Sequence, residues 1–371
     1  EKTNNWINSL RKGGAETNLY RLLKYDNQSN KKKIYVISIS PESFFTKKIK
    51  DMGHSVYCLN IKNKYLFFLK IYKIYKIIKQ INPDVVQTWM YHSCLIGGIV
   101  AKFAKCNNII WMIRHSSYKY FKTKITTIFV IKLCSLLSIY IPKKIIFCSN
   151  ESLNFHIKIG YDKRKAILIY NGYDKNHFTF KNTNNENTKK DKIIFSIIGR
   201  YNPQKDHQNF LNALSYISKD FINKIEFYII GKGIKNNTKI INEIQKKNIN
   251  FKINLLDSFI DIRDIFQLID YVILPSSYGE SFPNILAESM ISGIPCISTD
   301  VGESKNIIDK FGWIIPPNNP KKLSDSIVEA INLFSNSNKY LILSNKCHNH
   351  IITNFSEKIM IKKYNDIYLS L

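Results

Sequence analysis

Short apolar runs alternate with helix-like patterns along the whole chain, in two successive series. The first series predicts strands at 34–39, 55–59, 84–89, 109–113, 144–149 and 166–170, and the second predicts strands at 193–199, 225–231, 251–256, 271–275 and 295–299. Segments such as 92–105 and 122–139 lie between them and have the pattern of helices. Because strands that alternate with helices form a parallel sheet covered on both faces, each series predicts a doubly wound α/β domain.

A polar stretch, KNTNNENTKKDK at 181–192, separates the two series and has no apolar periodicity. We therefore predict a Rossmann-like domain at 1–178, a linker at 179–192, a second Rossmann-like domain at 193–355, and a helix at 356–371. A chain of 371 residues is long enough for two such cores.

The net charge of +27 results from 55 basic residues, mostly lysine, against 28 acidic ones. A genome bias toward Lys, Ile and Asn explains part of this excess, but a field of this size draws a protein toward anionic surfaces. Membrane phospholipid is the first choice of partner and nucleic acid the second. The segment YLFFLKIYKIYKIIKQ at 65–80 fits a helix in a membrane interface and equally a helix that packs on the first domain; the basic segment YKYFKTK at 118–124 favours the membrane slightly.

No uninterrupted apolar run is long enough to span a bilayer; the closest, 125–141, is interrupted by Lys132. The seven cysteines are scattered and predict buried thiols in a reducing compartment. The chain shows no charged-then-apolar leader, so we expect no secretion signal.

The segment GESFPNILAE at 279–288 ends an apolar run and opens a helical pattern. We expect Glu280 in the loop, Ser281 as a cap, and Pro283 in the first helical turn. The free backbone N–H groups from Phe282 to Ile285, to which Pro283 contributes none and Asn284 one, suit a phosphate or a sugar hydroxyl together with the positive end of the helix dipole. Glu288 lies roughly 10 Å beyond Ser281, so the two glutamates could hold opposite ends of an extended ligand such as a nucleotide sugar.

Arg200 and Lys205 directly follow a predicted strand, in GRYNPQKD. A strand, a glycine and two cations at fixed spacing form an anion site, although a solvated basic loop is the plain alternative.

ESFPNILAE resembles the two-glutamate motif of retaining glycosyltransferases with the GT-B fold, above all glycosyltransferase family 4. Further matches fall in the family's order: KGGAE at 12–16, IIWMIRHSS at 109–117, CSNESLNFHIKIG at 148–160, IYNGYDKNHF at 169–178, IGRYNPQKDHQNFLNAL at 198–214 and YIIGKG at 228–233. The resemblance implies two Rossmann-like domains facing each other across a donor/acceptor cleft, with helix 356–371 crossing back to the first domain. The family has a short strand before its Gly-Gly loop, whereas EKTNNWIN at 1–8 is a poor strand pattern, and Asp206 stands where the family often has Gly.

The resemblance also implies roles. Glu280 would hold the sugar hydroxyls, Glu288 the ribose, and Arg200 and Lys205 the diphosphate. Gly13 and Gly14 would let the backbone approach the donor, and Gly231 would shape the floor under the nucleotide; ordinary turns are the alternative for these glycines. His115 would contact the transferred sugar or orient the acceptor, unless it is merely exposed. Asn171, Gly172 and Asp174 fit a structural turn.

The sequence contains no Asp-x-Asp metal motif, so the charge of the leaving diphosphate would be met by Arg200, Lys205 and the helix start. No metal ion and no cofactor is expected.

We therefore predict a retaining hexosyltransferase that moves a hexose or N-acetylhexosamine from a nucleotide diphosphate sugar, a UDP-sugar being favoured. The predicted acceptor is a membrane-presented glycan or lipid-linked molecule in lipopolysaccharide or capsule biosynthesis. The expected location is cytoplasmic, peripheral on the inner face of the cytoplasmic membrane. A GT-B-fold sugar-nucleotide epimerase is one alternative, and a basic nucleic-acid-binding protein is another, although no base-stacking module is recognised.

Overall fold

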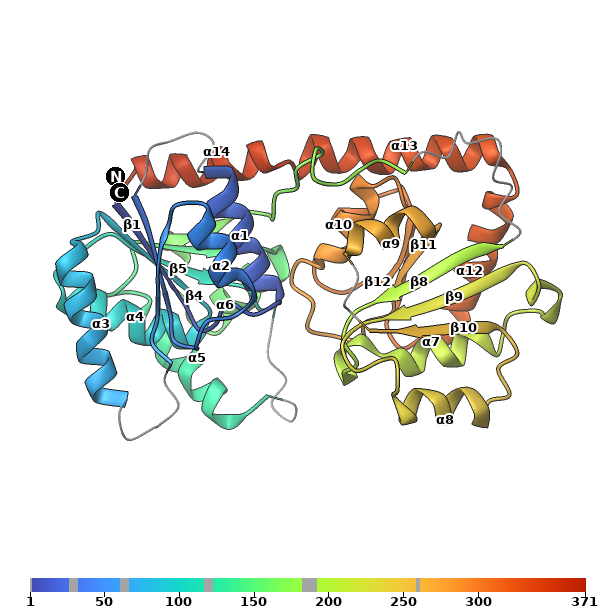
Figure 1. The fold of residues 1–371 in the computed structure, drawn as a ribbon, viewed down its shortest axis with the longest axis horizontal. Helices are drawn as coiled ribbons and strands as arrows, with labels where there is room; N and C mark the ends of the chain where they lie inside the picture. The colour runs from blue at the N-terminus through green and yellow to red at the C-terminus, as the bar shows by residue number, and fades with distance from the viewer. Residues whose placement is uncertain (1, 27–32, 61–66, 117–122, 182–191, 258–260) are drawn as a thin grey trace. The chain divides into compact units, whose positions relative to one another are not determined.

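The computed structural model describes every residue except 1, 27–32, 61–66, 117–122, 182–191 and 258–260, and only the backbone of residues 67–70. The chain forms two compact units (Figure 1). Unit 1 comprises Glu1–Gly172 and Glu357–Leu371, and unit 2 comprises Tyr173–Ser356. Most of the predicted linker lies outside the described residues.

Unit 1 contains a seven-stranded parallel sheet in the order β3-β2-β1-β4-β5-β6-β7. Its strands are β1 (Lys2–Ile7), β2 (Lys33–Ser38), β3 (Ser55–Cys58), β4 (Val85–Trp89), β5 (Ile109–Ile113), β6 (Lys144–Phe147) and β7 (Ala166–Leu168). Its helices are α1 (Gly14–Asp26), α2 (Phe44–Asp51), α3 (Phe67–Ile81), α4 (Tyr91–Phe103), α5 (Ile125–Leu137), α6 (Asn150–Lys158) and α14 (Glu357–Leu369). The six strands predicted for this domain are confirmed.

Both faces of this sheet are covered by helices, which explains the continuous apolar run of β5. Ile110 and Met112 pack in the cluster that includes residues of α1, α2 and α14. Ile109, Trp111 and Ile113 point to the other face and pack with α4 and α5. Because side chains alternate along a strand, a strand buried on both sides is apolar throughout.

Strand β1 was not predicted, yet it lies between β2 and β4. Its pattern is poor because Asn4 and Asn5 are polar, although both are buried. Asn5 Oδ1 accepts a hydrogen bond from Trp89 Nε1 at 3.1 Å, so a polar partner on β4 compensates for the burial of Asn5. Tertiary pairing therefore overrides local strand propensity here.

Helix α3 packs on the unit 1 core as an ordinary amphipathic helix. Ile74 and Ile78 are buried in a cluster with Trp6, whereas Lys73, Lys76 and Lys79 are exposed. In the part of α3 whose side chains are described, residues 71–81, the isoleucines pack against the core and the outward face is mainly lysine. Most of the basic segment 118–124 lies outside the described residues.

Unit 2 contains a six-stranded parallel sheet in the order β10-β9-β8-β11-β12-β13. Its strands are β8 (Ile193–Ile198), β9 (Ile225–Ile230), β10 (Lys252–Leu256), β11 (Tyr271–Leu274), β12 (Cys296–Thr299) and β13 (Trp313–Ile315). Its helices are α7 (His207–Leu214), α8 (Thr238–Lys246), α9 (Ile262–Leu268), α10 (Asn284–Ile291), α11 (Ser304–Ile308), α12 (Pro320–Phe334) and α13 (Ser337–Asn354). Only the short strand β13 was not predicted among the strands of this domain.

Residues 173–178, which we placed in the first domain, belong to unit 2. The Tyr173 N–H donates to the Phe355 carbonyl at 2.9 Å, and Tyr173 forms an isolated parallel bridge with Ser356. Phe178 is buried against Phe266 of α9. The terminal helix α14 belongs to unit 1, where Met360, Tyr364 and Ile367 are buried in the core.

No helix within the described part of the chain is both long and apolar enough to cross a membrane.

A buried ion pair ties the segment after Phe178 to the unit 2 sheet. Lys181 Nζ lies 2.6 Å from Asp270 Oδ1, and both side chains are buried. Asp270 Oδ2 also accepts a hydrogen bond from the Ile194 backbone N–H at 2.9 Å.

Asp270→Ala is expected to lower the free energy of unfolding of unit 2 by about 3–5 kcal/mol, because it leaves a buried lysine uncompensated. Urea denaturation measures the change. Asp325→Ala, which removes the exposed Lys321–Asp325 pair of the same unit, is the matched control and should cost less than about 1 kcal/mol. Equal small losses in both variants would contradict the prediction.

The buried His156 of unit 1 is expected to make stability pH-dependent. Its Nε2 lies 2.8 Å from the Tyr91 hydroxyl, and its Nδ1 lies 2.6 Å from the Ser152 carbonyl. Burial lowers the pKa of His156 to about 4, with the charge of His115 adding to this and the Ser152 bond opposing it. The folded pKa lies below that of an unfolded histidine, so stability is fully present above about pH 6.5 and is lost as pH falls toward 4.

The loss should approach about 3 kcal/mol for this one group. Urea titrations from pH 7 to 4 should show a shallower pH dependence for His156→Gln than for wild type. The exposed His92 supplies the control His92→Gln, which should keep the wild-type slope. An unchanged slope in His156→Gln would contradict the assignment.

Candidate functional site

Three of the predicted donor residues, Arg200, Lys205 and Glu280, lie in the loops where the strand order of unit 2 reverses. From β8 the chain continues to β9 on one side, whereas β11 lies on the other side of β8. The loops that follow β8 and β11 therefore leave the same edge in different directions, and such a reversal point is where doubly wound sheets bind ligands. The two loops touch, because the Ser277 N–H donates to the Gln204 carbonyl at 2.9 Å.

A salt bridge joins one predicted residue from each loop. Lys205 Nζ lies 2.7 Å from Glu280 Oε1, and the two side chains are 17% and 11% exposed. The Ser276 hydroxyl donates to the same oxygen at 2.8 Å. The fixed partners of Glu280 thus both approach Oε1, inside a largely buried site where charged hydrogen bonds are strong.

Ser276 was not predicted. Its only signal in the sequence is its place four residues before Glu280, at the end of a buried strand. Its carbonyl in turn accepts a hydrogen bond from the Thr299 hydroxyl at 2.6 Å, which ties it to β12.

The segment after Glu280 differs in detail from the expectation. Helix α10 begins at Asn284, with Pro283 as its N-cap residue and no side-chain cap, so Ser281 does not cap it. Phe282 is buried, and its ring stacks on Tyr173 at 6.2 Å and meets Phe355 at 5.6 Å. Pro283 lies just outside the helix because its backbone is extended, with φ −70° and ψ 95°. Phe282 is therefore a core anchor of the segment.

The remaining residues of the motif lie on α10. Asn284 and Glu288 are four residues apart, so they share one face of the helix, while Ile285 is half-buried. The Tyr173 hydroxyl donates to Asn284 Oδ1 at 2.6 Å.

Two glycines allow the loop backbones of the site to touch. A Cβ on Gly231 would lie 2.0 Å from the Gly199 carbonyl oxygen, and a Cβ on Gly302 would lie 2.4 Å from the Glu280 carbonyl oxygen. Gly302 also has a positive φ of 58°. Any side chain at either position would push the site loops apart. At Gly231, the displaced loop would be the one that carries Arg200.

Arg200 is exposed, and Lys205 ends a short 3-10 turn at Pro203–Lys205. Asp206 follows in the left-handed region, with a φ of 46°. That backbone explains why glycine is suited to this position. Asp206 compensates as the N-cap of α7, because its Oδ1 accepts a hydrogen bond from the Asn209 N–H at 3.1 Å.

In unit 1, Gly13 and Gly14 lie after β1, at the corresponding reversal between β1 and β4. Gly14 begins α1, and the exposed Gly13 lies under the Glu16 side chain, whose carboxylate would contact any Cβ there. The Ser9 hydroxyl donates to Glu16 Oε1 at 2.9 Å. The absence of a side chain at Gly13 therefore lets Glu16 fold back over the loop.

His115 follows β5 at the same edge and is exposed. Its ring stacks on Tyr91 at 5.6 Å with an interplanar angle of 13°. The Tyr91 hydroxyl forms a hydrogen bond with the buried His156. The exposed His115 therefore stacks on an aromatic ring that is itself fixed.

The neighbouring Arg114 is used structurally: its Nη1 donates to Asn171 Oδ1 at 2.7 Å.

Met90, between β4 and α4, was missed. It has φ 74° and ψ 155°, a region that is essentially restricted to glycine. Sequence offers no signal for this, because the conformation follows from how α4 leaves the sheet.

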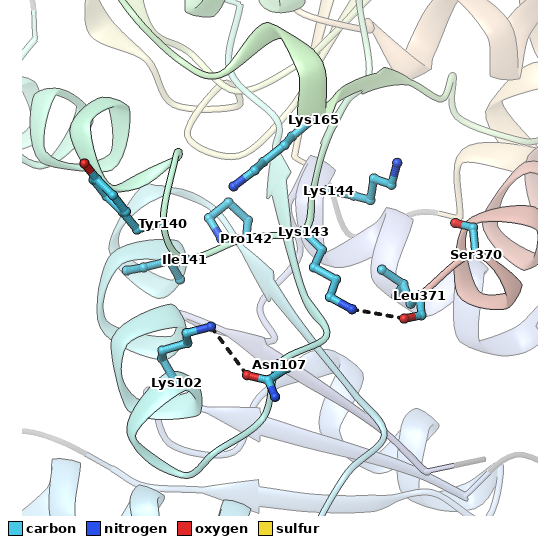
Figure 2. Close-up of a pocket in the computed structure, with 10 residues that line it drawn as sticks. All are labelled: Lys102, Asn107, Tyr140, Ile141, Pro142, Lys143, Lys144, Lys165, Ser370 and Leu371. Carbon is cyan, nitrogen blue, oxygen red and sulfur yellow. Dashed lines mark hydrogen bonds between the residues drawn. The ribbon is translucent and has the colours of Figure 1, made fainter.

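The structure also shows a pocket of about 510 Å³ in unit 1, at the end of α5 (Figure 2). It is lined by Lys102, Asn107, Tyr140, Ile141, Pro142, Lys143, Lys144, Lys165, Ser370 and Leu371. None of the predicted site residues lines it.

Among the described residues, no three His, Cys, Asp or Glu side chains gather where they could hold a metal ion. Metal-independent transfer stays a prediction.

Comparison with known proteins places these features in a family. Residues 12–177 match the model of Glycosyltransferase Family 4, and residues 178–346 match that of Glycosyl transferases group 1. The chain is 26% identical over 308 residues to the Escherichia coli UDP-Gal:alpha-D-GlcNAc-diphosphoundecaprenol alpha-1,3-galactosyltransferase, which covers 80% of this chain and 78% of the relative. It is 24% identical over 358 residues, or 90% of both chains, to the Campylobacter jejuni N,N'-diacetylbacillosaminyl-diphospho-undecaprenol alpha-1,3-N-acetylgalactosaminyltransferase.

The fold matches solved structures as well. The crystal structure of Anabaena HepE in complex with UDP-glucose has a TM-score of 0.83 at 16% identity and covers 100% of both chains. With two parallel-sheet units and both family models matched in order, the chain belongs to the group 1, family 4 glycosyltransferases with the GT-B fold.

Proposed function

We propose that this chain is a retaining, metal-independent glycosyltransferase that moves a hexose or N-acetylhexosamine from a UDP-sugar to a lipid-linked acceptor. It would act in surface polysaccharide biosynthesis, on the inner face of the cytoplasmic membrane. The observation that carries the proposal is the Lys205–Glu280 salt bridge, 2.7 Å long, at the strand reversal of unit 2.

In this proposal the salt bridge sets a cation that would bind the diphosphate beside a carboxylate that would bind the sugar. Lysine has three donors, so Lys205 can keep Glu280 as a partner while it donates to a diphosphate oxygen. Lys205 and Ser276 both approach Glu280 Oε1, and Oε2 is the oxygen through which Glu280 would accept a sugar hydroxyl. Arg200 would add a second cation for the diphosphate, and Glu288 on α10 would accept the ribose hydroxyls.

In this arrangement Glu280 positions the sugar and is not a nucleophile, because its Oε1 is already engaged by an ammonium and a hydroxyl. The acceptor hydroxyl would attack from the face that the diphosphate leaves, and a diphosphate oxygen would take its proton. The anomeric configuration would therefore be retained. Lys205 and Arg200 would stabilise the charge that develops on the leaving group.

The names of the two relatives support the acceptor class. Both act on diphospho-undecaprenol-linked sugars, and the first uses UDP-Gal. We infer the same general acceptor class for this chain, a sugar on a lipid diphosphate. We also assign sugar and acceptor contacts to His115, which stacks on Tyr91, and to the Gly13–Gly14 loop.

Glu280→Ala is expected to reduce turnover by roughly a hundredfold to a thousandfold, because the transferred sugar loses a fixed hydrogen-bond acceptor. The assay follows transfer from a UDP-sugar to a water-soluble acceptor analogue. Glu243→Ala, on α8 of the same unit, is the control and should stay near wild type. Near-normal turnover of Glu280→Ala with the correct donor would contradict the assignment.

Lys205→Met is expected to weaken the binding of UDP itself by roughly 10- to 100-fold, the usual effect of losing a charged hydrogen bond. The rise in melting temperature on adding UDP measures this, relative to each variant alone. Glu280→Ala should keep the UDP-induced rise, since UDP lacks the transferred hexose, and the exposed Lys219→Met is the matched control. A full UDP response in Lys205→Met would show that Lys205 does not bind the diphosphate.

Incubation of donor alone separates the transferase from an epimerase of the same fold. A transferase leaves the sugar of the UDP-sugar unchanged until acceptor is added, whereas an epimerase converts it without acceptor.

A further inference from the structure

Helix α5 presents large apolar side chains to solvent along one face. Ile125, Phe129 and Leu136 are 83%, 61% and 67% exposed, and Tyr140 in the following turn is 73% exposed. Within the helix, spacings of four and seven residues keep Ile125, Phe129 and Leu136 on one side. We refer to Ile125, Phe129, Leu136, Ile139 and Tyr140, together with Phe103, as the α5 surface.

The exposure is not needed for packing, because the opposite face of α5 already fills the core. Ile128, Ile131 and Cys134 are buried there, and Ile131 and Cys134 belong to the cluster that includes Trp111 and Phe147. The helix is thus apolar on both sides. Phe103 ends helix α4, which contacts α5, and is itself 76% exposed.

Lysines accompany the α5 surface. Lys124 and Lys132 are exposed on or next to α5. At its far end, Lys102, Lys143, Lys144 and Lys165 line the pocket shown in Figure 2, which also contains Tyr140. Burial lowers the pKa of Lys165, and although Asp162 opposes this, the charges of Arg164 and Lys102 add to it.

Nothing acidic offsets this charge along the same stretch of chain. Residues 85–150, which include α4 and α5, contain no Asp or Glu. By contrast, the described outward face of α3 is mainly basic, because its isoleucines are buried or half-buried and only Tyr72 among its described large apolar side chains is exposed. The α5 surface therefore combines exposed aliphatic and aromatic groups with a local excess of lysines.

This combination matches one type of partner, a bilayer that contains anionic phospholipid. Aliphatic side chains such as Ile125 and Leu136 gain little from a nucleic acid, whose sites stack bases on aromatic rings, but they enter the acyl region of a membrane. Flanking lysines can keep their stems in the apolar layer and their ammonium groups at the phosphates.

We propose that the α5 surface is the membrane-docking surface of this protein, with its apolar side chains inserted at the interface and its lysine pocket at the headgroup phosphates. The inference rests on the proposed function, because a lipid-linked acceptor requires the enzyme to work at a membrane. It assigns membrane docking to α5 in place of the segment 65–80 considered from the sequence.

Co-sedimentation of the full chain with vesicles tests the docking surface without any transfer reaction. The wild type should bind vesicles of phosphatidylcholine mixed with phosphatidylglycerol and bind those of phosphatidylcholine alone at least about tenfold more weakly. Phe129→Ser/Leu136→Ser and, separately, Lys102→Gln/Lys132→Gln should each weaken binding to the anionic vesicles at least about tenfold.

The matched control removes two exposed lysines from the other basic helix of unit 1. Lys73→Gln/Lys76→Gln should change vesicle binding by no more than about twofold; an equal loss in this variant would show non-specific charge attraction and overturn the assignment to α5. Unchanged vesicle binding by Phe129→Ser/Leu136→Ser would overturn it as well. If the wild type is a dimer in solution that this variant converts to a monomer, and vesicles are not bound, the surface covers a second copy and the proposal fails.

Two further measurements separate this inference from the proposed function. Glu280→Ala should bind anionic vesicles like wild type, and Phe129→Ser/Leu136→Ser should keep the UDP-induced rise in melting temperature, which also shows that it is folded. Transfer to a water-soluble acceptor by a wild type that does not bind vesicles would overturn the docking surface alone. Vesicle binding that depends on α5, without any transfer activity, would uphold the docking surface and overturn the transferase.

Discussion

The parallel direction of all strands within each sheet is the constraint on which the rest of the structure depends. It places every carboxyl end at one edge, and the strand order reverses once in each sheet, beside β1 and beside β8. Loops that leave the two central strands in different directions make room for a ligand between them. Lys205 and Glu280 are 75 positions apart in the sequence, yet this geometry brings their charged atoms within 2.7 Å.

The loops themselves are held by backbone contacts more than by side chains. The Gly199 carbonyl occupies the space of a Cβ on Gly231, and the Glu280 carbonyl occupies that of a Cβ on Gly302. The Glu303 N–H donates to the Ser281 carbonyl at 2.9 Å. Because backbone contacts of this kind leave little room for adjustment, they fix the loops that carry Glu280 and Lys205.

Sequence alone predicted most of the sheets, because strands buried on both faces, such as IIWMI, have an unmistakable pattern. It failed where a residue's environment is made by distant parts of the chain. Asn5 looks unsuited to a central strand until Trp89 supplies its partner, and Ser276 gains its role only from the return of Glu280 toward β11.

The roles of two helices also depend on distant parts of the chain. The segments 65–80 and 125–141 are both apolar and interrupted by lysine, so periodicity could not separate them. Packing does so: the isoleucines of α3 face inward, whereas α5 has more apolar side chains than its contact with the sheet can cover.

At Met90 the chain keeps a methionine in backbone angles that only glycine adopts freely, at a cost of roughly 1–3 kcal/mol. A glycine there would relieve the strain, but it would also give the start of α4 more freedom. Tyr91, which carries the stacked His115, is the very next residue. The strained methionine therefore restricts the backbone at the start of α4, at some cost in thermodynamic stability. This restriction keeps the Tyr91 ring in a fixed orientation.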